Sequence, residues 1–127
     1  MKYHSASVLT FFTVMILFSC KGKTIIPNQS DREMTCGDGN SVVKSVKDVK
    51  GTITYNSLEK VYTIVVTMPH TIDSQDVGII CNLPKSLEEE GKQISFDGEY
   101  RTYSKQPIKI FAGQTYYYLK LTRIVVK

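Results

Sequence analysis

Residues 93–103 read QISFDGEYRTY, and their side chains alternate between apolar and polar along the chain. Ile94, Phe96 and Tyr100 fall on one face of this segment, together with Gly98. Alternation with a period of two predicts a half-buried β-strand. Glycine in the middle of a strand indicates a bulge or a sharp bend. We therefore expect a strand that bends at Gly98 and turns one face toward a core.

Four more segments have the composition of strands, and a turn at 56–59 joins the first two as a hairpin. The predicted strands are Val46–Asn56, Lys60–Met68, Val77–Cys81 and Thr115–Val126, in addition to Gln93–Tyr103. A short helix is predicted at Lys85–Glu90, with Asn82 as its cap, Pro84 in its first turn and Gly91 as its stop. The predicted fold class is mainly β: a small five-stranded barrel with one short helix between strands 3 and 4.

This order of elements resembles the OB-fold, a five-stranded Greek-key barrel. Residues 81–84, 94–100 and 116–122 also resemble small OB-like lipoproteins of Bacteroidetes. The resemblance covers roughly the last 50 residues, and its motifs are mostly structural. It implies an OB-like barrel and leaves the function open. An SH3-like barrel or a small sandwich has similar strands and is the alternative.

The first 19 residues are typical of a lipoprotein signal peptide. A basic start precedes an apolar run from Val8 to Phe18, which is too short to span a bilayer core of about 30 Å. The segment Leu17-Phe18-Ser19-Cys20 resembles the lipobox of bacterial lipoproteins, in which the cysteine is acylated and the peptide is cut before it. The resemblance implies lipidation of Cys20. Lys21 after the cysteine points to an outer-membrane lipoprotein that faces the periplasm. An ordinary signal peptide with a chance cysteine, or a buried helix, is the alternative.

Residues 20–35 are expected to form the lipidated N-terminus and a flexible tether, and residues 36–127 the barrel domain. Without residues 1–19 the chain has 108 residues, with 15 basic and 12 acidic side chains and a formal charge of +3. Because this charge is small and scattered, no nucleic-acid partner is expected. The expected partners are the membrane, through the lipid, and an envelope protein or glycan. The length excludes a second enzyme domain beside a cofactor domain.

Two cysteines remain once Cys20 is assigned to the anchor. The periplasm is oxidising, so a disulfide between Cys36 and Cys81 is the natural expectation. It would close a loop of about 45 residues and contribute roughly 4 kcal/mol in the chain-entropy model. Two unpaired thiols are the alternative.

No set of residues with catalytic or metal-binding spacing is found. His70 lies in a predicted loop with no nucleophile nearby in the sequence. Asp97 and Glu99 share a strand face and could act as an acid–base pair, but an exposed polar face explains them equally simply and is favoured. Residues 38–41 and 73–76 carry oxygen ligands without the spacing of a calcium loop. We therefore expect no catalytic residue, no metal and no cofactor.

Tyrosines on the last strand are the remaining candidates for a binding site. Leu119 and Leu121 should face the core with Tyr117, whereas Tyr116, Tyr118 and Lys120 fall on the other face. Aromatic side chains next to a cation can stack on sugars or bases, as in OB-folds. The plainer interpretation is that they are ordinary strand residues covered by their neighbours. The candidate ligand contacts are Tyr103, Tyr116, Tyr118 and Lys120.

The favoured function is a lipid-anchored, non-catalytic binding domain of the cell envelope. The alternatives are an envelope enzyme inhibitor that presents the loop 108–113, a structural envelope component, and a hydrolase that uses His70 or Asp97.

Overall fold

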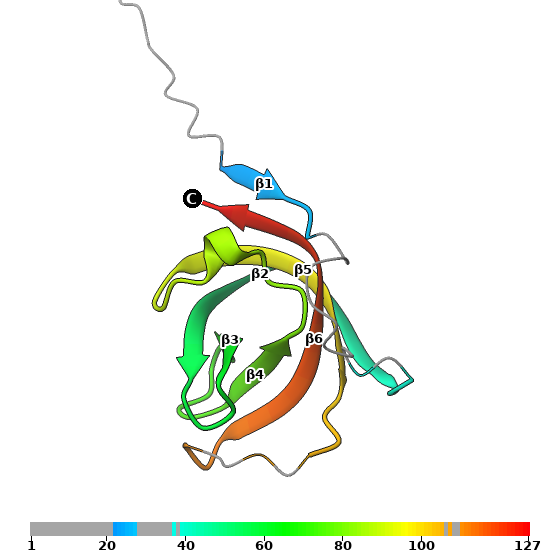
Figure 1. The fold of residues 1–127 in the computed structure, drawn as a ribbon. Helices are drawn as coiled ribbons and strands as arrows, with labels where there is room; N and C mark the ends of the chain where they lie inside the picture. Colours follow the sequence, from blue (N-terminus) through cyan, green and yellow to red (C-terminus); the bar gives the residue numbers. More distant parts are fainter. Residues whose placement is uncertain (1–21, 28–36, 38, 106, 108–109) are drawn as a thin grey trace, which may run out of the picture.

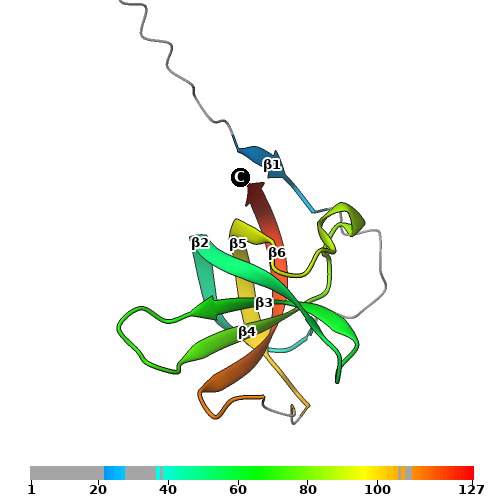
Figure 2. The same cartoon turned by 90° about the vertical axis from the view of Figure 1, so that its left-hand side faces the viewer.

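The computed structural model describes residues 22–27, 37, 39–105, 107 and 110–127. Its elements are β1 Lys23–Ile25, β2 Val42–Asn56, β3 Val61–Thr67, β4 Gln75–Ile80, the 3-10 turn η1 Lys85–Leu87, β5 Gln93–Thr102 and β6 Gln114–Val126. Strands β2 to β6 wrap into a barrel, and β1 lies outside it, beside β6 (Figures 1 and 2).

The barrel is closed, and it confirms the predicted OB-like fold class. Neighbouring strands follow the order β6-β4-β3-β2-β5, and β5 pairs again with β6. The β4–β6 pair is parallel, with Ile80 beside Leu119, and the other barrel pairs are antiparallel. Closure leaves no barrel strand with a fully unpaired edge, which removes a common cause of aggregation.

The helix predicted at Lys85–Glu90 was wrong in extent, because only a single 3-10 turn forms there. Asn82, the expected cap, is used elsewhere: its side-chain amide donates to the Leu121 carbonyl at 2.8 Å and its carbonyl accepts from the Leu121 N–H at 3.1 Å. The turn therefore has no side-chain cap. Leu87 is 3% exposed and closes the end of the core. A longer helix would add three glutamates, which have no apolar surface to bury, to the single buried leucine.

The predicted irregularity at Gly98 is confirmed. Asp97 pairs with Arg123 and Gly98 with Leu121, so β6 has one extra residue at this point. A Cβ on Gly98 would lie 2.7 Å from the carbonyl oxygen of Lys120, which is closer than real contacts allow. The bulge changes the face on which β6 side chains point, so that both Leu121 and Ile124 are buried.

A second bulge, in β2, is held by side chains of β5 and β6. Lys47 and Asp48 interrupt the β2–β5 register, and Asp48 has a φ of 50°. The carboxylate of Asp97 accepts the Asp48 backbone N–H at 2.7 Å and two N–H groups of Arg123 at 2.8 and 2.9 Å. These hydrogen bonds, which we call the Asp97 clip, connect β2, β5 and β6 at the point where the barrel bends.

Apolar side chains from all five barrel strands fill the interior. The buried members are Ile53, Ile64, Ile80, Leu83, Leu87, Ile94, Phe96, Tyr100, Leu119, Leu121 and Ile124. The inward faces predicted for residues 93–103 and for the last strand are therefore correct.

An ion pair borders this core. Lys44 of β2 contacts the carboxylate of Asp76, which is 6% exposed. The Lys44 ammonium also lies 4.9 Å from the ring centre of Tyr100 and 5.1 Å from that of Tyr117. Burial, and secondarily the charge of Asp76, raises the pKa of Tyr100.

Strand β1 was not predicted, because residues 20–35 were assigned to the tether. It pairs with the end of β6: Lys23 with Val126, Thr24 with Val125 and Ile25 with Ile124. The backbone is already close at Gly22, where a Cβ would lie 2.9 Å from a methyl group of Val125. Residues 22–25 are therefore held against the end of β6.

Candidate functional site

The outer face of β3, β4 and β6 carries a second apolar cluster, separate from the barrel interior. Val77 and Ile79 of β4 and Tyr116 of β6 are buried in it. Partly buried side chains pack around them: Val61, Val65, Tyr103 and Tyr118. Three of the four predicted ligand contacts therefore belong to one cluster.

The three tyrosines contact one another through their rings. The ring centres of Tyr103 and Tyr118 are 4.8 Å apart in an edge-on arrangement, and those of Tyr103 and Tyr116 are 6.3 Å apart. Tyr116 is 7% exposed and offers little surface to a ligand. Tyr103 and Tyr118 are half-buried and form the accessible part of the cluster.

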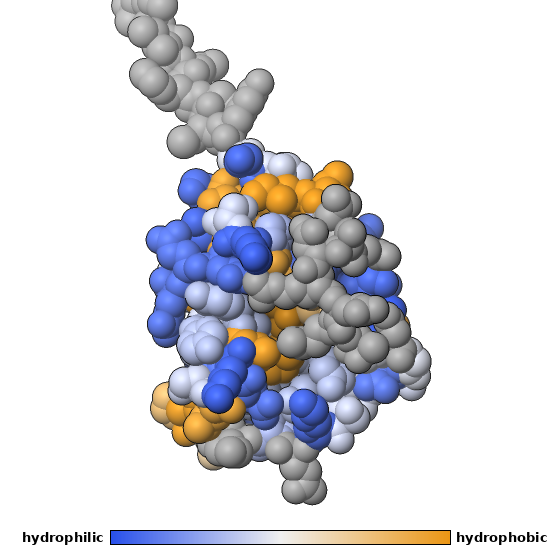
Figure 3. Space-filling model, viewed as in Figure 1, coloured by the Kyte–Doolittle hydropathy of each residue, from blue (hydrophilic) through white to orange (hydrophobic). Residues whose placement is uncertain are grey.

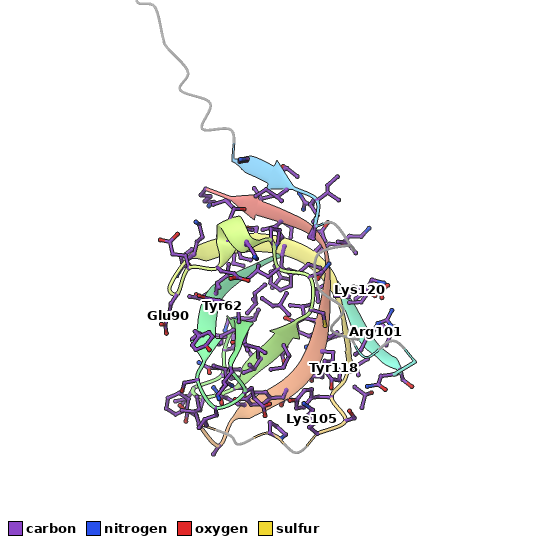
Figure 4. All side chains as sticks on the ribbon, viewed as in Figure 1. Tyr62, Glu90, Arg101, Lys105, Tyr118 and Lys120 are labelled. Atoms are coloured by element: carbon purple, nitrogen blue, oxygen red, sulfur yellow. The ribbon has the colours of Figure 1, made fainter. Side chains whose placement is uncertain are left out.

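The fourth predicted contact, Lys120, lies apart from these ring contacts. It is half-buried and stands opposite Glu99 in the β5–β6 register. Figure 4 shows Lys120 on the same side of the barrel as Arg101, above Tyr118. Arg101 forms an ion pair with Glu99 at 3.0 Å. The structure therefore places Lys120 beside charged groups of β5.

A groove of about 320 Å³ adjoins the tyrosine cluster and lies on the outer face of β2, β3 and β4. It is lined by Thr52, Thr54, Tyr55, Asn56, Thr63, Val65, Thr67, Gln75, Val77, Ile110, Phe111, Gln114 and Tyr116. None of these side chains carries a charge at neutral pH. Tyr116 and Val77 belong to both the groove and the tyrosine cluster, so the two features form one continuous surface. We call this groove the threonine groove.

One wall of the threonine groove is hydrophobic and exposed. Ile110 and Phe111, in the turn before β6, are 57% and 61% exposed. Figure 3 shows a hydrophobic patch at this end of the molecule, where β6 begins. Exposed aromatic and aliphatic side chains beside a concave polar surface are typical of binding sites.

Hydrogen bonds fix the turn that carries this wall. Gln114 is 5% exposed, and its carbonyl accepts the Ile110 N–H at 3.3 Å and the Tyr116 hydroxyl at 3.2 Å. Its amide donates to Gln75 at 3.1 Å. Gln114 thereby ties the turn to β4 and β6. These hydrogen bonds hold the hydrophobic wall in place beside the groove.

Burial keeps the hydroxyls of Tyr103 and Tyr116 neutral. Burial, followed by the charge of Glu59, raises the pKa of Tyr103 to about 12. Burial also raises the pKa of Tyr116. The described lining of the threonine groove therefore presents hydroxyls, amides and apolar groups rather than charges.

The candidate acid–base residues are in structural or exposed positions. Hydrogen bonds from Arg123 and from the Asp48 N–H lower the pKa of Asp97 to about 2, so this carboxyl is ionised and poorly suited to donate a proton. His70 is exposed in the β3–β4 loop, with a φ of 65°.

The cysteine assignments fall partly outside the described residues. Cys20 and Cys36 lie there, so lipidation and the Cys36–Cys81 disulfide stay predictions. Cys81 is 5% exposed. Gly37, the residue after Cys36, is buried against the ring of Tyr118, and Tyr118 pairs with Ile79, two residues before Cys81.

The described residues contain neither a cluster of metal ligands nor a long apolar helix. They contain no group of three or more His, Cys, Asp or Glu side chains arranged to hold a metal ion. Within the same residues, no helix has the length and apolar character needed to cross a bilayer.

The sequence matches no protein family model, and no curated protein is detectably similar to it.

The threonine groove was missed by the sequence analysis, which placed the site on Tyr103 and β6. The loop 108–113 was considered only as the segment that an enzyme inhibitor would present, and its apolar residues Ile108, Ile110 and Phe111 were the available signal. Thr52 and Thr54 of β2 and Thr63 of β3 read as ordinary outward strand residues. Only the β2–β3 register, which pairs Thr54 with Thr63, brings them to the same surface.

Proposed function

We propose that this protein is a lipid-anchored, non-catalytic binding domain of the cell envelope, and that the threonine groove holds an uncharged ligand. The anchor is Cys20, at the outer membrane and facing the periplasm. The ligand contacts are centred on Phe111 and Thr54, with Tyr103 and Tyr118 at the adjoining edge.

The uncharged lining of the groove carries this proposal. A polyanion such as a nucleic acid requires lysine or arginine contacts to its phosphates, and the described residues of the groove lining supply none. The half-buried Thr52 and Thr54 and the exposed Thr67 carry hydroxyls that can donate and accept hydrogen bonds without a charge. Phe111 can cover an apolar ring face. A neutral glycan has both features, a ring of polar hydroxyls and apolar C–H faces.

The position of the groove also supports a binding role. In OB-folds the second and third barrel strands and the adjacent loops bind oligosaccharides and oligonucleotides. Here those strands are β3 and β4, and the loop before β6 contributes Ile110 and Phe111. This is an argument from the fold class, and the lining residues decide between the two kinds of ligand.

A glycan-binding screen with the wild-type chain and two variants tests the proposal. Phe111→Ala should weaken binding of the selected neutral glycan by roughly tenfold or more, since stacking contacts contribute about 1–3 kcal/mol. Val43→Ala is the matched control, because Val43 is 52% exposed and lies outside the groove. Thr54→Val removes a hydroxyl at nearly constant volume and should also weaken binding. Absence of binding to every neutral glycan, or equal binding by the Phe111 and Val43 variants, would refute the proposal.

A second candidate function is an inhibitor of an envelope enzyme. The observation in its favour is the exposure of Ile110 and Phe111 on a turn held by Gln114. A rigid, exposed apolar turn can enter the cleft of another protein. Co-purification of a hydrolase from the native envelope, lost with Phe111→Ala and without glycan binding, would favour this function.

A further inference from the structure

The pairing of β1 with β6 leaves very little chain between the proposed lipid and the barrel. Only Lys21 and Gly22 separate Cys20 from Lys23, the first residue of β1. An extended chain spans at most about 3.3–3.6 Å per residue, so three residues reach roughly 10 Å. That distance is comparable with the thickness of a headgroup layer. A lipid on Cys20 therefore brings the β1 end of the barrel to the membrane surface.

This end of the barrel contains a second, chemically different pocket. It has a volume of about 370 Å³ and lies between β1, η1 and the end of β6. Lys23, Lys92 and Lys127 supply three ammonium groups, and Ser86 supplies a hydroxyl. Its remaining lining is apolar: Ile25, Leu87 and Val126. Among the described residues no acidic side chain lines it, in contrast to the mixed charge of the chain as a whole.

The lysines of this pocket are largely available. Lys92 binds the carboxylate of Glu89 at 2.7 Å, but Glu89 is 68% exposed and can move away at little cost. Lys23 and Lys127 have no ion-pair partner among the described residues. Lysine binds a phosphate as a flexible point charge, so a pocket of this kind suits phosphate headgroups.

An exposed apolar side chain lies next to the pocket. Ile26 directly follows β1 and is 79% exposed. In water this exposure is unfavourable, whereas at a bilayer surface an aliphatic side chain can enter the boundary between headgroups and acyl chains.

We infer that the β1 end of the barrel is a membrane-docking surface, in which Lys23, Lys92 and Lys127 bind anionic phospholipid headgroups and Ile26 inserts beside them. The inference rests on the proposed lipidation of Cys20. It fixes the orientation of the barrel: β1 and η1 face the membrane, and the turn with Phe111 lies at the opposite end (Figures 1 and 2). The groove is then open to the periplasm.

Depth-dependent quenching of a single tryptophan tests this orientation directly. The chain contains no tryptophan, so Ile26→Trp and Phe111→Trp each introduce one reporter. The lipidated full chain is reconstituted in vesicles of roughly three parts phosphatidylcholine to one part phosphatidylglycerol that carry brominated acyl chains. We expect quenching of the Ile26→Trp reporter to exceed that of Phe111→Trp by about twofold or more. Equal quenching at the two positions would overturn the inference.

Charge variants test the lysines separately. In the Ile26→Trp background, changing Lys23, Lys92 and Lys127 to Gln should reduce quenching in anionic vesicles, because each basic residue at such a surface increases partition by about fivefold. Changing Lys47, Lys50 and Lys60 to Gln removes the same charge from exposed positions outside the pocket and should leave quenching unchanged. The same reduction in both sets would show that net charge, rather than this pocket, is responsible, and would contradict the docking surface.

The proposed lipid anchor can be refuted separately from the docking surface. If Cys20 is not acylated, the intact mass lacks the acyl chains and the protein does not float with vesicles, which refutes the anchor together with the orientation. If the protein floats and Ile26→Trp is not quenched, the anchor stands and only the docking surface is refuted. Glycan binding by the groove is measured independently of both.

Discussion

The ion pair between Lys44 and Asp76 makes a testable contribution to the stability of the barrel. The side chain of Asp76 is 9% exposed and that of Lys44 is 30% exposed. Removing one member of a fully buried pair costs about 3–5 kcal/mol, because the other charge is left without a partner in a poorly solvated place. Since Lys44 is partly solvated, we expect Lys44→Met to lower the free energy of unfolding by about 2–3 kcal/mol. This estimate includes the loss of the contacts of the ammonium with Tyr100 and Tyr117, about 0.5–1 kcal/mol each.

Urea unfolding followed by circular dichroism measures this loss. Thermal unfolding measures it as well: for a domain of this size 1 kcal/mol corresponds to a shift in Tm of about 4–8 °C, so the expected decrease in Tm is roughly 8–24 °C. Asp76→Asn alone should also destabilise the protein. The double variant Lys44→Met/Asp76→Asn should be more stable than the sum of the single effects predicts, with a coupling energy of about 1–2 kcal/mol.

A surface pair provides the control. Lys92→Met breaks the ion pair with the exposed Glu89 and should change stability little. Lys44→Met with the stability of the wild type would refute the reasoning, as would strictly additive effects in the double variant. Either result would mean that Asp76 is well solvated in the absence of Lys44.

Three further predictions concern the bulges and the disulfide. Gly98→Ala should destabilise the barrel by about 1–3 kcal/mol, because the new methyl group meets the Lys120 carbonyl oxygen; the exposed Ser45→Ala on the adjacent strand should change stability by less than about 0.5 kcal/mol in the same urea experiment. Because Arg123 lowers the pKa of Asp97 to about 2, the stability from this carboxylate is complete above about pH 4 and is lost as the pH falls toward 2; Asp97→Asn should flatten this part of the pH–stability curve, and an unchanged curve would argue against the Asp97 clip. Alkylation of the unfolded, unreduced chain should modify neither Cys36 nor Cys81, and reduction should lower stability by up to roughly 4 kcal/mol; two modified thiols would rule the bridge out.

The strands of the barrel were predictable because alternation and turn residues are local features of the sequence. Strand β5 alternates in burial over its ten residues, and Gly98 marks the place where its register with β6 shifts. The helix was mispredicted for the same reason. Asn82 and Pro84 are good local signals for a helix start, but the side chain of Asn82 bonds to the backbone of Leu121, 39 residues away. Local preference gives way when a distant partner offers two hydrogen bonds.

The surfaces to which we assign a function depend on residues that are distant in the sequence. Strand β1 has three residues, too few for a period, and its partner is about a hundred residues further along. Asp76 was assigned to a loop, so its contact with Lys44 was not foreseen. The threonine groove combines four elements, and its wall comes from the turn before β6. Such surfaces follow from register and closure, which alternation alone does not determine.

Strand β6 connects the two proposed surfaces. It begins at Gln114, which positions the Phe111 wall, and ends at Val126, which lines the lysine pocket and pairs with Lys23. Thirteen strand residues at about 3.3 Å each extend up to roughly 40 Å, less the curvature. Because β6 is hydrogen-bonded to β5 and to β4, we expect it to keep its length and direction when its membrane-facing end binds lipid. In the docked orientation the groove is therefore held at a fixed height above the membrane. A long flexible tether would instead have let the groove sample many heights, and this difference gives β1 a function beyond the stability of the barrel.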